Sequence, residues 1–416
     1  MMTQLQEMGQ RAQKAARMLS TVSTSKKNEA LIAIAEHLER RQDEILKANA
    51  ADMEAAKMSG MTSSLLDRLS LTSKRLQAIA MSVRDVASLP DPIGKIIGGG
   101  TNPNGLRIEK ISVPLGVVGM IFEARPNVVA DAAVLCLKSS NASILRGGKE
   151  AIHTGSALEK VMRDALESVH LPADCIQLVK DTSRDSALEM MKLNGYLDVL
   201  IPRGGAGLIR SVVENATVPV IETGTGNCHV YVDASADLEM ACQIVDNAKT
   251  SRPSVCNAIE NVLVHREVAA SFLPLMKKAL DTHQVELRGC PETVRILGNC
   301  VTPASMEDYD TEFLDYILAV KVVDSLEEAI CHINAHSTRH SECIVTRDYG
   351  NSRKFIREID AAAVYVNAST RFTDGGEFGL GAEIGISTQK LHARGPMGLT
   401  ALTSYKYIVE GDGQIR

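Results

Sequence analysis

Short runs rich in β-branched residues alternate with helical patterns along most of this chain. From residue 117 onward, helical stretches separate the candidate strands GVVGMIF, ASILRG, IQLVKD and DVLIP. A second alternating region, over residues 228–367, contains the candidate strands CHVYVD, NVLVH, ILAVKVV, ECIVT and AAVYVN. Strands that alternate with helices in this way are typical of parallel sheets covered by helices. The sequence therefore predicts an α/β protein.

The two ends of the chain carry other patterns. Residues 1–90 show apolar positions at helical spacing with charges between them, which predicts helices. Gly98, Gly99 and Gly100 are predicted to interrupt the chain, and the alternation over residues 105–113 predicts an exposed, paired strand. The chain finishes with a strand-like SYKYIV segment. At 416 residues, two or three domains are expected.

The composition excludes several classes of function. A formal charge of -6 argues against a nucleic-acid partner, and aromatic residues, at 3%, provide little for stacking on bases. No apolar run approaches the roughly 20 residues of a membrane helix, and the N-terminal segment lacks the apolar core of a signal peptide. Nine scattered cysteines without a CxxC pair indicate reduced thiols, as in a cytoplasmic protein.

Cys256 is the candidate nucleophile. It follows the turn-forming segment Arg252-Pro-Ser and precedes the β-rich run AIENVLVH, so it is predicted to lie on an exposed loop. A reactive thiol needs access and a nearby cation or helix N-terminus that lowers its pKa, and Arg252 is close in sequence. By itself, the same residue also fits a small apolar side chain buried in a core.

Two glycine-containing loops follow predicted strands and carry cations. The later loop, which contains Arg203, opens a helix, where backbone N–H groups can bind a phosphate. A tight turn is the alternative reading of this loop. In the earlier loop, the cations Arg146 and Lys149 suit the binding of a ribose or a 2′-phosphate. A solvated strand-to-helix loop is the alternative reading of this loop. The two loops comprise Arg146, Gly147 and Lys149, and Arg203, Gly204 and Gly205.

Polar residues also follow other predicted strands. Arg125 and Asn127 can donate hydrogen bonds to an oxyanion, and Asn127 also suits a helix cap. Glu222 opens an E-x-G-x-G turn and fits either a general base or a tether of the turn. The loop Ser369-Thr370-Arg371 suits recognition of a carboxylate or a phosphate, with a surface salt bridge as the alternative for its arginine.

The histidines show no HExxH pattern, and the closely spaced pair of His332 and His336 lies in an otherwise ordinary helical segment. The sequence therefore predicts no metal site.

The order of the motifs resembles the aldehyde dehydrogenase superfamily. A strand-end amide or cation comes first, followed by a basic strand-end pair, a strand–Gly-Gly–helix loop, the E-x-G-x-G turn and then a cysteine. The resemblance extends from about residue 113 to the C-terminus. It is most specific in segments that resemble members reducing an acyl phosphate, namely PLGVVGMIFEARPN, LIPRGGAGLI, SRPSVCNAIENVLV, YVNASTRFTDGGEFGLGAE and STQKLHARGPMGL.

The resemblance implies three structural parts. A Rossmann-type NADP-binding domain is expected over residues 1–104 and 113–228, and an α/β catalytic domain over residues 229–395. A small β-flap that builds oligomers is expected over residues 105–112 and 396–416. A homo-oligomer, dimer or tetramer, is implied, and glutamate 5-kinase is a candidate partner.

The resemblance also implies roles for individual residues. Cys256 corresponds to the nucleophile, with Arg125 or Asn127 as the oxyanion donor. Glu222 corresponds to the water-activating glutamate of hydrolytic members, and we expect it to be turned away or structural. The expected cofactor-binding residues are Arg146, Gly147, Lys149, Arg203, Gly204, Gly205, Glu312 and Phe313, and the expected substrate-binding residues are Arg252, Ser369, Thr370 and Arg371.

The implied activity is the NADPH-dependent reduction of L-glutamyl 5-phosphate to L-glutamate 5-semialdehyde and phosphate. It proceeds through a cysteine thioester and is the second step of proline biosynthesis from glutamate. NADPH is favoured because Lys149 lies where NAD-preferring relatives often carry an acidic residue. Two alternatives remain, a hydrolytic or CoA-acylating aldehyde dehydrogenase on the same fold and a non-catalytic NADP-binding protein.

Overall fold

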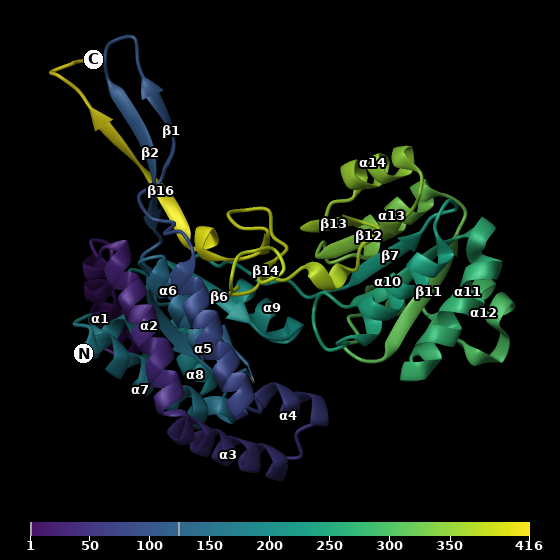
Figure 1. Cartoon of the computed structure of the whole chain (residues 1–416), viewed down its shortest axis with the longest axis horizontal. Coiled ribbons are helices and arrows are strands. Elements are labelled where there is room, and N and C mark those ends of the chain that lie inside the picture. The colour runs from purple at the N-terminus through teal and green to yellow at the C-terminus, as the bar shows by residue number, and fades with distance from the viewer. Residues whose placement is uncertain (1, 124) are drawn as a thin grey trace. The chain divides into compact units, whose positions relative to one another are not determined.

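The chain forms two compact units in its computed structural model, which describes residues 2–123 and 125–416. The first unit comprises residues 1–223, 379–385 and 397–416, and the second comprises residues 224–378 and 386–396. Each unit contains a parallel sheet with helices packed on it (Figure 1). The predicted α/β fold is therefore confirmed.

The first unit is built on a four-stranded parallel sheet with the order β5-β4-β3-β6. All six residues of β3 are buried, as expected for an inner strand of a parallel sheet covered by helices. The strands are β3 (Val117–Phe122), β4 (Ala142–Arg146), β5 (Ile176–Leu178) and β6 (Val199–Arg203). They match the four strands predicted for this region.

Helices form the predicted helical N-terminal region. The first begins with a capping box, in which Thr3 and Gln6 exchange side-chain to backbone hydrogen bonds. The helices of this unit are α1 (Gln4–Leu19), α2 (Thr24–Arg40), α3 (Gln42–Met58), α4 (Ser63–Leu69), α5 (Ser73–Ser88), α6 (Asn127–Lys138), α7 (Ile152–Ser168), α8 (Arg184–Met191) and α9 (Ala206–Asn215).

A three-stranded antiparallel sheet, called the flap here, also belongs to the first unit. It consists of β1 (Ile96–Thr101), β2 (Arg107–Pro114) and β16 (Thr403–Glu410), with β2 in the centre (Figure 1). The expectation that Gly98, Gly99 and Gly100 interrupt the chain is wrong, because they lie within β1. A Cβ at Gly99 would lie 2.2 Å from the carbonyl oxygen of Ile108, so glycine permits this close pairing of strands.

The second unit contains a seven-stranded parallel sheet with the order β10-β9-β11-β8-β7-β12-β13. Its strands are β7 (Cys228–Val232), β8 (Ile259–His265), β9 (Glu286–Gly289), β10 (Thr302–Pro303), β11 (Ile317–Val323), β12 (Ser341–Val345) and β13 (Ala363–Val366). A separate antiparallel pair joins β14 (Ile386–Ser387) and β15 (Gly395–Pro396).

Neighbouring residues of the inner strands contribute to different apolar cores. On β7, Val230 and Val232 belong to one core, whereas Tyr231 of the same strand belongs to the other core, together with Leu263 of β8. Side chains alternate between the two faces of a strand, so both faces of this sheet are covered. One core includes residues of α10 (Leu238–Thr250), α11 (Arg266–Leu280) and α12 (Pro291–Leu297), and the other includes residues of α13 (Leu326–His336) and α14 (Tyr349–Glu358).

Among the helices described, none is both long enough and apolar enough to cross a membrane.

Candidate active site

Cys256 lies in the connection between α10 and β8, which is called the nucleophile loop here (residues 251–258). The cysteine is partly exposed, and Arg252 of the same loop is exposed, as the sequence predicts. The thiol of Cys228 donates to the carbonyl oxygen of Cys256 at 3.2 Å. Because the loop precedes β8, the candidate nucleophile lies at the amino-terminal edge of the sheet.

The E-x-G-x-G turn contains a glycine that lies directly against the nucleophile loop. A Cβ built on Gly226 would lie 1.5 Å from the carbonyl oxygen of Cys256 and 2.6 Å from its Cα. The N–H of Gly226 donates to Oε1 of Glu312 at 2.7 Å, and the side chain of Asn227 donates to the carbonyl of Tyr309 at 2.7 Å. The turn is thus fixed between the nucleophile loop and the segment around Glu312.

The predicted anion-recognition loop reaches the nucleophile loop through Arg371. Its Nε donates to the hydroxyl of Ser251 at 3.0 Å, and its Nη1 donates to the side-chain oxygen of Asn257. Thr370 donates its hydroxyl proton to the carbonyl of Asn257 at 2.7 Å, while the hydroxyl of Ser369 accepts from the N–H of Arg371. Two loops far apart in sequence are therefore joined by hydrogen bonds next to Cys256, with Asn257, Ser369 and Thr370 buried between them.

Two guanidinium groups and the candidate thiol influence each other in this region. Burial lowers the pKa of Arg371, Arg252 lowers it further, and Asp374 and then Cys256 oppose both effects. An arginine remains charged despite such a shift. The neighbourhood of Cys256 therefore favours an anionic substrate.

The cofactor-binding candidates Arg146 and Arg203 lie at the carboxyl edge of the sheet in the first unit. The register places them on either side of β3, because Arg146 pairs with Ile121 and Arg203 pairs with Phe122. Loops at the carboxyl ends of parallel strands form the usual ligand-binding edge of such a sheet.

Arg146 is held in place by backbone carbonyl groups. Its Nη2 donates to the carbonyls of Thr182 and Ser183 at 2.7 and 2.8 Å. Its Nε is buried and has no hydrogen-bond partner among the described residues, and burial lowers the pKa of the side chain. Lys149, in the following turn, is exposed. The two cations therefore differ in exposure, and backbone carbonyls fix the orientation of Arg146.

Glu123 is a site residue that the sequence analysis did not single out. Its Oε2 accepts a hydrogen bond from the N–H of Gly205 at 2.9 Å, and a Cβ on Gly204 would lie 2.5 Å from the same oxygen. Gly205 is the N-cap of α9, where backbone N–H groups favour an anion. The position predicted for a phosphate is thus bound by the protein's own carboxylate.

Asn127 is the first residue of α6, and the N-cap is Pro126 without a side-chain hydrogen bond. The alternative reading of Asn127 as a helix cap is therefore wrong. Its Nδ2 donates instead to Oδ2 of Asp131 at 2.9 Å, and burial raises the pKa of Asp131 to about 6. Arg125 is partly exposed. The choice between Arg125 and Asn127 as the oxyanion donor stays a prediction.

Glu222 belongs to the first unit and is partly buried. It precedes Thr223, whose hydroxyl donates to the carbonyl of Pro202 at 2.8 Å, so the backbone here is tied to the end of β6. Its expected structural role stays a prediction.

The closely spaced histidines His332 and His336 pack against each other. The rings of His332 and His336 are 4.3 Å apart, and burial lowers the pKa of His332 to about 2, which keeps it neutral. Within the described part of the chain, no group of three or more His, Cys, Asp or Glu side chains could hold a metal ion.

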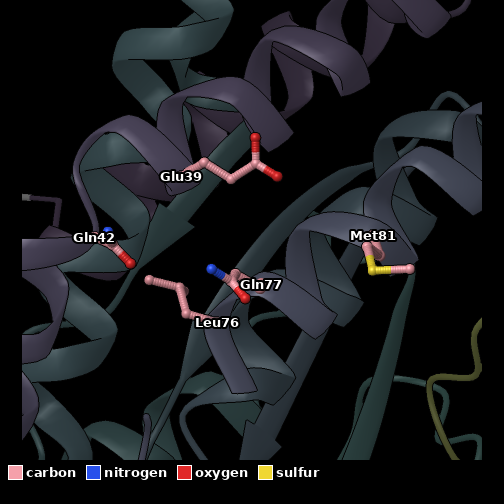
Figure 2. A pocket seen from close by; sticks show the side chains of 5 residues that line it. All are labelled: Glu39, Gln42, Leu76, Gln77 and Met81. Carbon is pink, nitrogen blue, oxygen red and sulfur yellow. The ribbon is translucent and has the colours of Figure 1, made fainter. Parts of the chain in front are cut away.

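A groove of about 340 Å³ lies among the N-terminal helices (Figure 2). None of its lining residues is a candidate site residue. Its carboxylate, Glu39, is paired with Arg84 at 2.6 Å. The lining residues are Glu39, Gln42, Leu76, Gln77 and Met81.

Comparisons with known proteins match the whole chain. Residues 2–308 and 296–407 match the model of the "Aldehyde dehydrogenase family". A curated protein of Heliobacterium modesticaldum named gamma-glutamyl phosphate reductase is 60% identical over 98% of each chain, and its namesake from Carboxydothermus hydrogenoformans is 57% identical over the full length of both. The crystal structure of gamma-glutamyl phosphate reductase from Thermotoga maritima is 48% identical, covers both chains completely and has a TM-score of 0.96.

Proposed function

Because this chain belongs to the aldehyde dehydrogenase family, we propose that it reduces L-glutamyl 5-phosphate to L-glutamate 5-semialdehyde and phosphate with NADPH. This reaction is the second step of proline biosynthesis from glutamate. The observation that carries the proposal is the sequence identity of 60% and 57%, over 98% and 100% of the chain, to curated proteins named gamma-glutamyl phosphate reductase. The oxidoreductase class rests on the family itself.

In the proposed first step, the thiolate of Cys256 attacks the acyl carbon of the substrate. The bond from this carbon to the phosphate oxygen breaks, phosphate leaves and a thioester forms. Arg252 and Arg371 attract the anionic substrate, because both cations lie near the thiol. The backbone N–H of Cys256, with Arg125 or Asn127, stabilises the oxyanion.

In the proposed second step, the thioester is reduced and the aldehyde is released. NADPH, when bound, supplies the hydride for this reduction. Arg146 and Lys149 would hold the ribose and the 2′-phosphate, and the orientation of Arg146 by two carbonyls supports this role. Arg203, Gly204 and Gly205 would face the pyrophosphate, which would displace the carboxylate of Glu123 from the N–H of Gly205. Glu312 and Phe313 would lie at the nicotinamide ribose. The collapse of the reduced adduct returns the thiolate of Cys256.

Dependence on phosphate tests the proposed reaction in reverse. Glutamate 5-semialdehyde and NADP⁺ are expected to produce NADPH only when inorganic phosphate is present, because phosphate must attack the thioester. The measurement is the absorbance of NADPH with and without phosphate. Full activity without phosphate would instead indicate hydrolysis assisted by Glu222, and activity only with CoA would indicate an acylating dehydrogenase.

The substitution Lys149→Glu tests the preferred cofactor. We expect the ratio of kcat/KM with NADPH to that with NADH to fall by about 10-fold or more, because a carboxylate would repel the 2′-phosphate. Reactivity of Cys256 toward iodoacetamide serves as the control and is expected to remain unchanged. An unaltered cofactor ratio would contradict the assignment of Lys149.

We further propose that the flap joins copies of this chain into a dimer or tetramer. Several large apolar side chains of its strands are exposed, and exposed apolar patches mark protein interfaces. They are Ile96, Ile97, Tyr405, Tyr407 and Val409. An interaction with glutamate 5-kinase and a cytoplasmic location stay predictions.

A further inference from the structure

A buried ion pair joins the two ends of the nucleophile loop. Lys249 lies in the last turn of α10 and Glu260 is the second residue of β8. Neither side chain is exposed, and Nζ lies 2.5 Å from Oε2. The proposed mechanism uses neither residue.

Stability alone does not account for this pair. Two charges lose their hydration when they are buried, and apolar residues of similar volume often stabilise a core equally well. Burial raises the pKa of Glu260 to about 7 and lowers the pKa of Lys249, while each partner opposes the shift of the other. The pair also has a contact outside itself, through the second carboxylate oxygen of Glu260.

The second carboxylate oxygen of Glu260 fixes the segment that contains Glu312. Oε1 accepts a hydrogen bond from the N–H of Leu314 at 3.1 Å. Leu314 has a φ of +56°, which is unfavourable for a residue with a Cβ and persists where surrounding contacts maintain it. Leu314 follows directly after Glu312 and Phe313, so this hydrogen bond restrains the position of both.

The contacts return from Glu312 to the nucleophile. Glu312 accepts from the N–H of Gly226, and Gly226 lies against the backbone of Cys256 without space for a side chain. A continuous series of contacts therefore runs from the base of the nucleophile loop through Glu260, Leu314 and Glu312 back to Cys256. All of these residues belong to the second unit.

We propose that Lys249 and Glu260 are positioning residues that fix Glu312 relative to Cys256 for the reduction of the thioester. Lys249 orients the carboxylate of Glu260, and Glu260 holds Leu314 and the two residues before it. The inference rests on the proposed function, in which Glu312 contacts the nicotinamide ribose. Hydride transfer is the step most sensitive to this geometry, because a small misplacement of reacting groups strongly reduces its rate.

Two double variants separate the positioning role from the charges. Single substitutions are avoided because they would leave one buried charge without its partner. Lys249→Gln/Glu260→Gln removes both charges but keeps an amide oxygen that can accept from Leu314. Lys249→Met/Glu260→Met removes the charges and the acceptor together.

The variants are compared in the oxidation of glutamate 5-semialdehyde by NADP⁺ with phosphate. We expect the methionine pair to lower kcat about 10-fold relative to the glutamine pair, with KM for the aldehyde little changed. The deuterium isotope effect on kcat, measured with the aldehyde deuterated at its reacting carbon, is expected to rise in the methionine pair. Alkylation of Cys256 by iodoacetamide is expected to proceed equally in both.

Equal kcat values and equal isotope effects in the two double variants would overturn the inference. A parallel loss of alkylation rate and thermal stability in the methionine pair would also overturn it, because the ion pair would then only support the loop. Amide hydrogen exchange at Leu314 is a measurement that needs no substrate. The exchange rate is expected to increase in the methionine pair alone. An unchanged exchange rate in that pair would contradict the positioning role. Absence of phosphate-dependent activity in the unmodified enzyme would instead refute the proposed function.

Discussion

Replacement of Cys256 by serine is expected to reduce turnover by about 10³-fold or more, because a serine hydroxyl is not ionised near neutral pH and forms a poorer hydride acceptor. Binding of NADPH is expected to be retained, since the substitution leaves every cofactor-binding candidate unchanged, including Arg146 and Arg203 of the first unit. The measurements are the phosphate-dependent formation of NADPH and the change in NADPH fluorescence on binding.

Cys300→Ser is the matched control for this substitution. Cys300 is an exposed cysteine in a short 3-10 helix (Gly298–Cys300) and has no part in the proposed mechanism. Its replacement is expected to leave kcat unchanged. Turnover by the Cys256→Ser variant at the rate of the unmodified enzyme would refute the assignment of the nucleophile.

Gly226→Ala is expected to lower kcat by about 10²-fold, although Gly226 makes no contact with substrate in the proposed mechanism. The added Cβ would lie 1.5 Å from the carbonyl oxygen of Cys256, which is backbone and cannot rotate away. The nucleophile loop must therefore move. Overpacking of this kind typically also lowers the free energy of unfolding, by about 1–3 kcal/mol.

The effect of Gly226→Ala is measured as kcat, as the alkylation rate of Cys256 and as the midpoint of thermal unfolding. Gly100→Ala is the control, because a Cβ at Gly100 meets no atom within 4 Å and its backbone is that of an ordinary strand. A Gly226→Ala enzyme with unchanged kcat and alkylation rate would show that the contact with Cys256 does not constrain the thiol.

Much of the fold was predictable because its signals are local. Most strands of both parallel sheets are short apolar runs with helical segments between them, and this pattern arises from burial on both faces of a sheet. The short strands β9 and β10 carry no such apolar run, and the sequence predicted neither of them. The prediction that Gly98, Gly99 and Gly100 interrupt the chain is wrong because glycine in a sequence indicates a turn as readily as a close approach of two strands. Only the pairing of β1 with β2 distinguishes the two.

In the first unit, the sequence predicted part of the candidate site. Arg146 and Arg203 end β4 and β6, the two parallel strands that flank β3, so a sequence that predicts the strands also predicts that these residues share an edge. Glu123 follows the strand between them and was overlooked, although its place directly after β3 was a usable signal. Its hydrogen bond to Gly205 depends on the side-by-side arrangement of β3 and β6.

The sequence by itself determined the α/β class, the helical N-terminus and the identity of Cys256 as the candidate nucleophile, because strand periodicity and motif order are properties of the linear chain. Only the tertiary structure decided which distant groups surround that thiol. Gly226, Arg371 and the pair of Lys249 and Glu260 reach the nucleophile loop from separate elements. Such contacts depend on strand order and side-chain packing, which the spacing of residues along the chain does not specify.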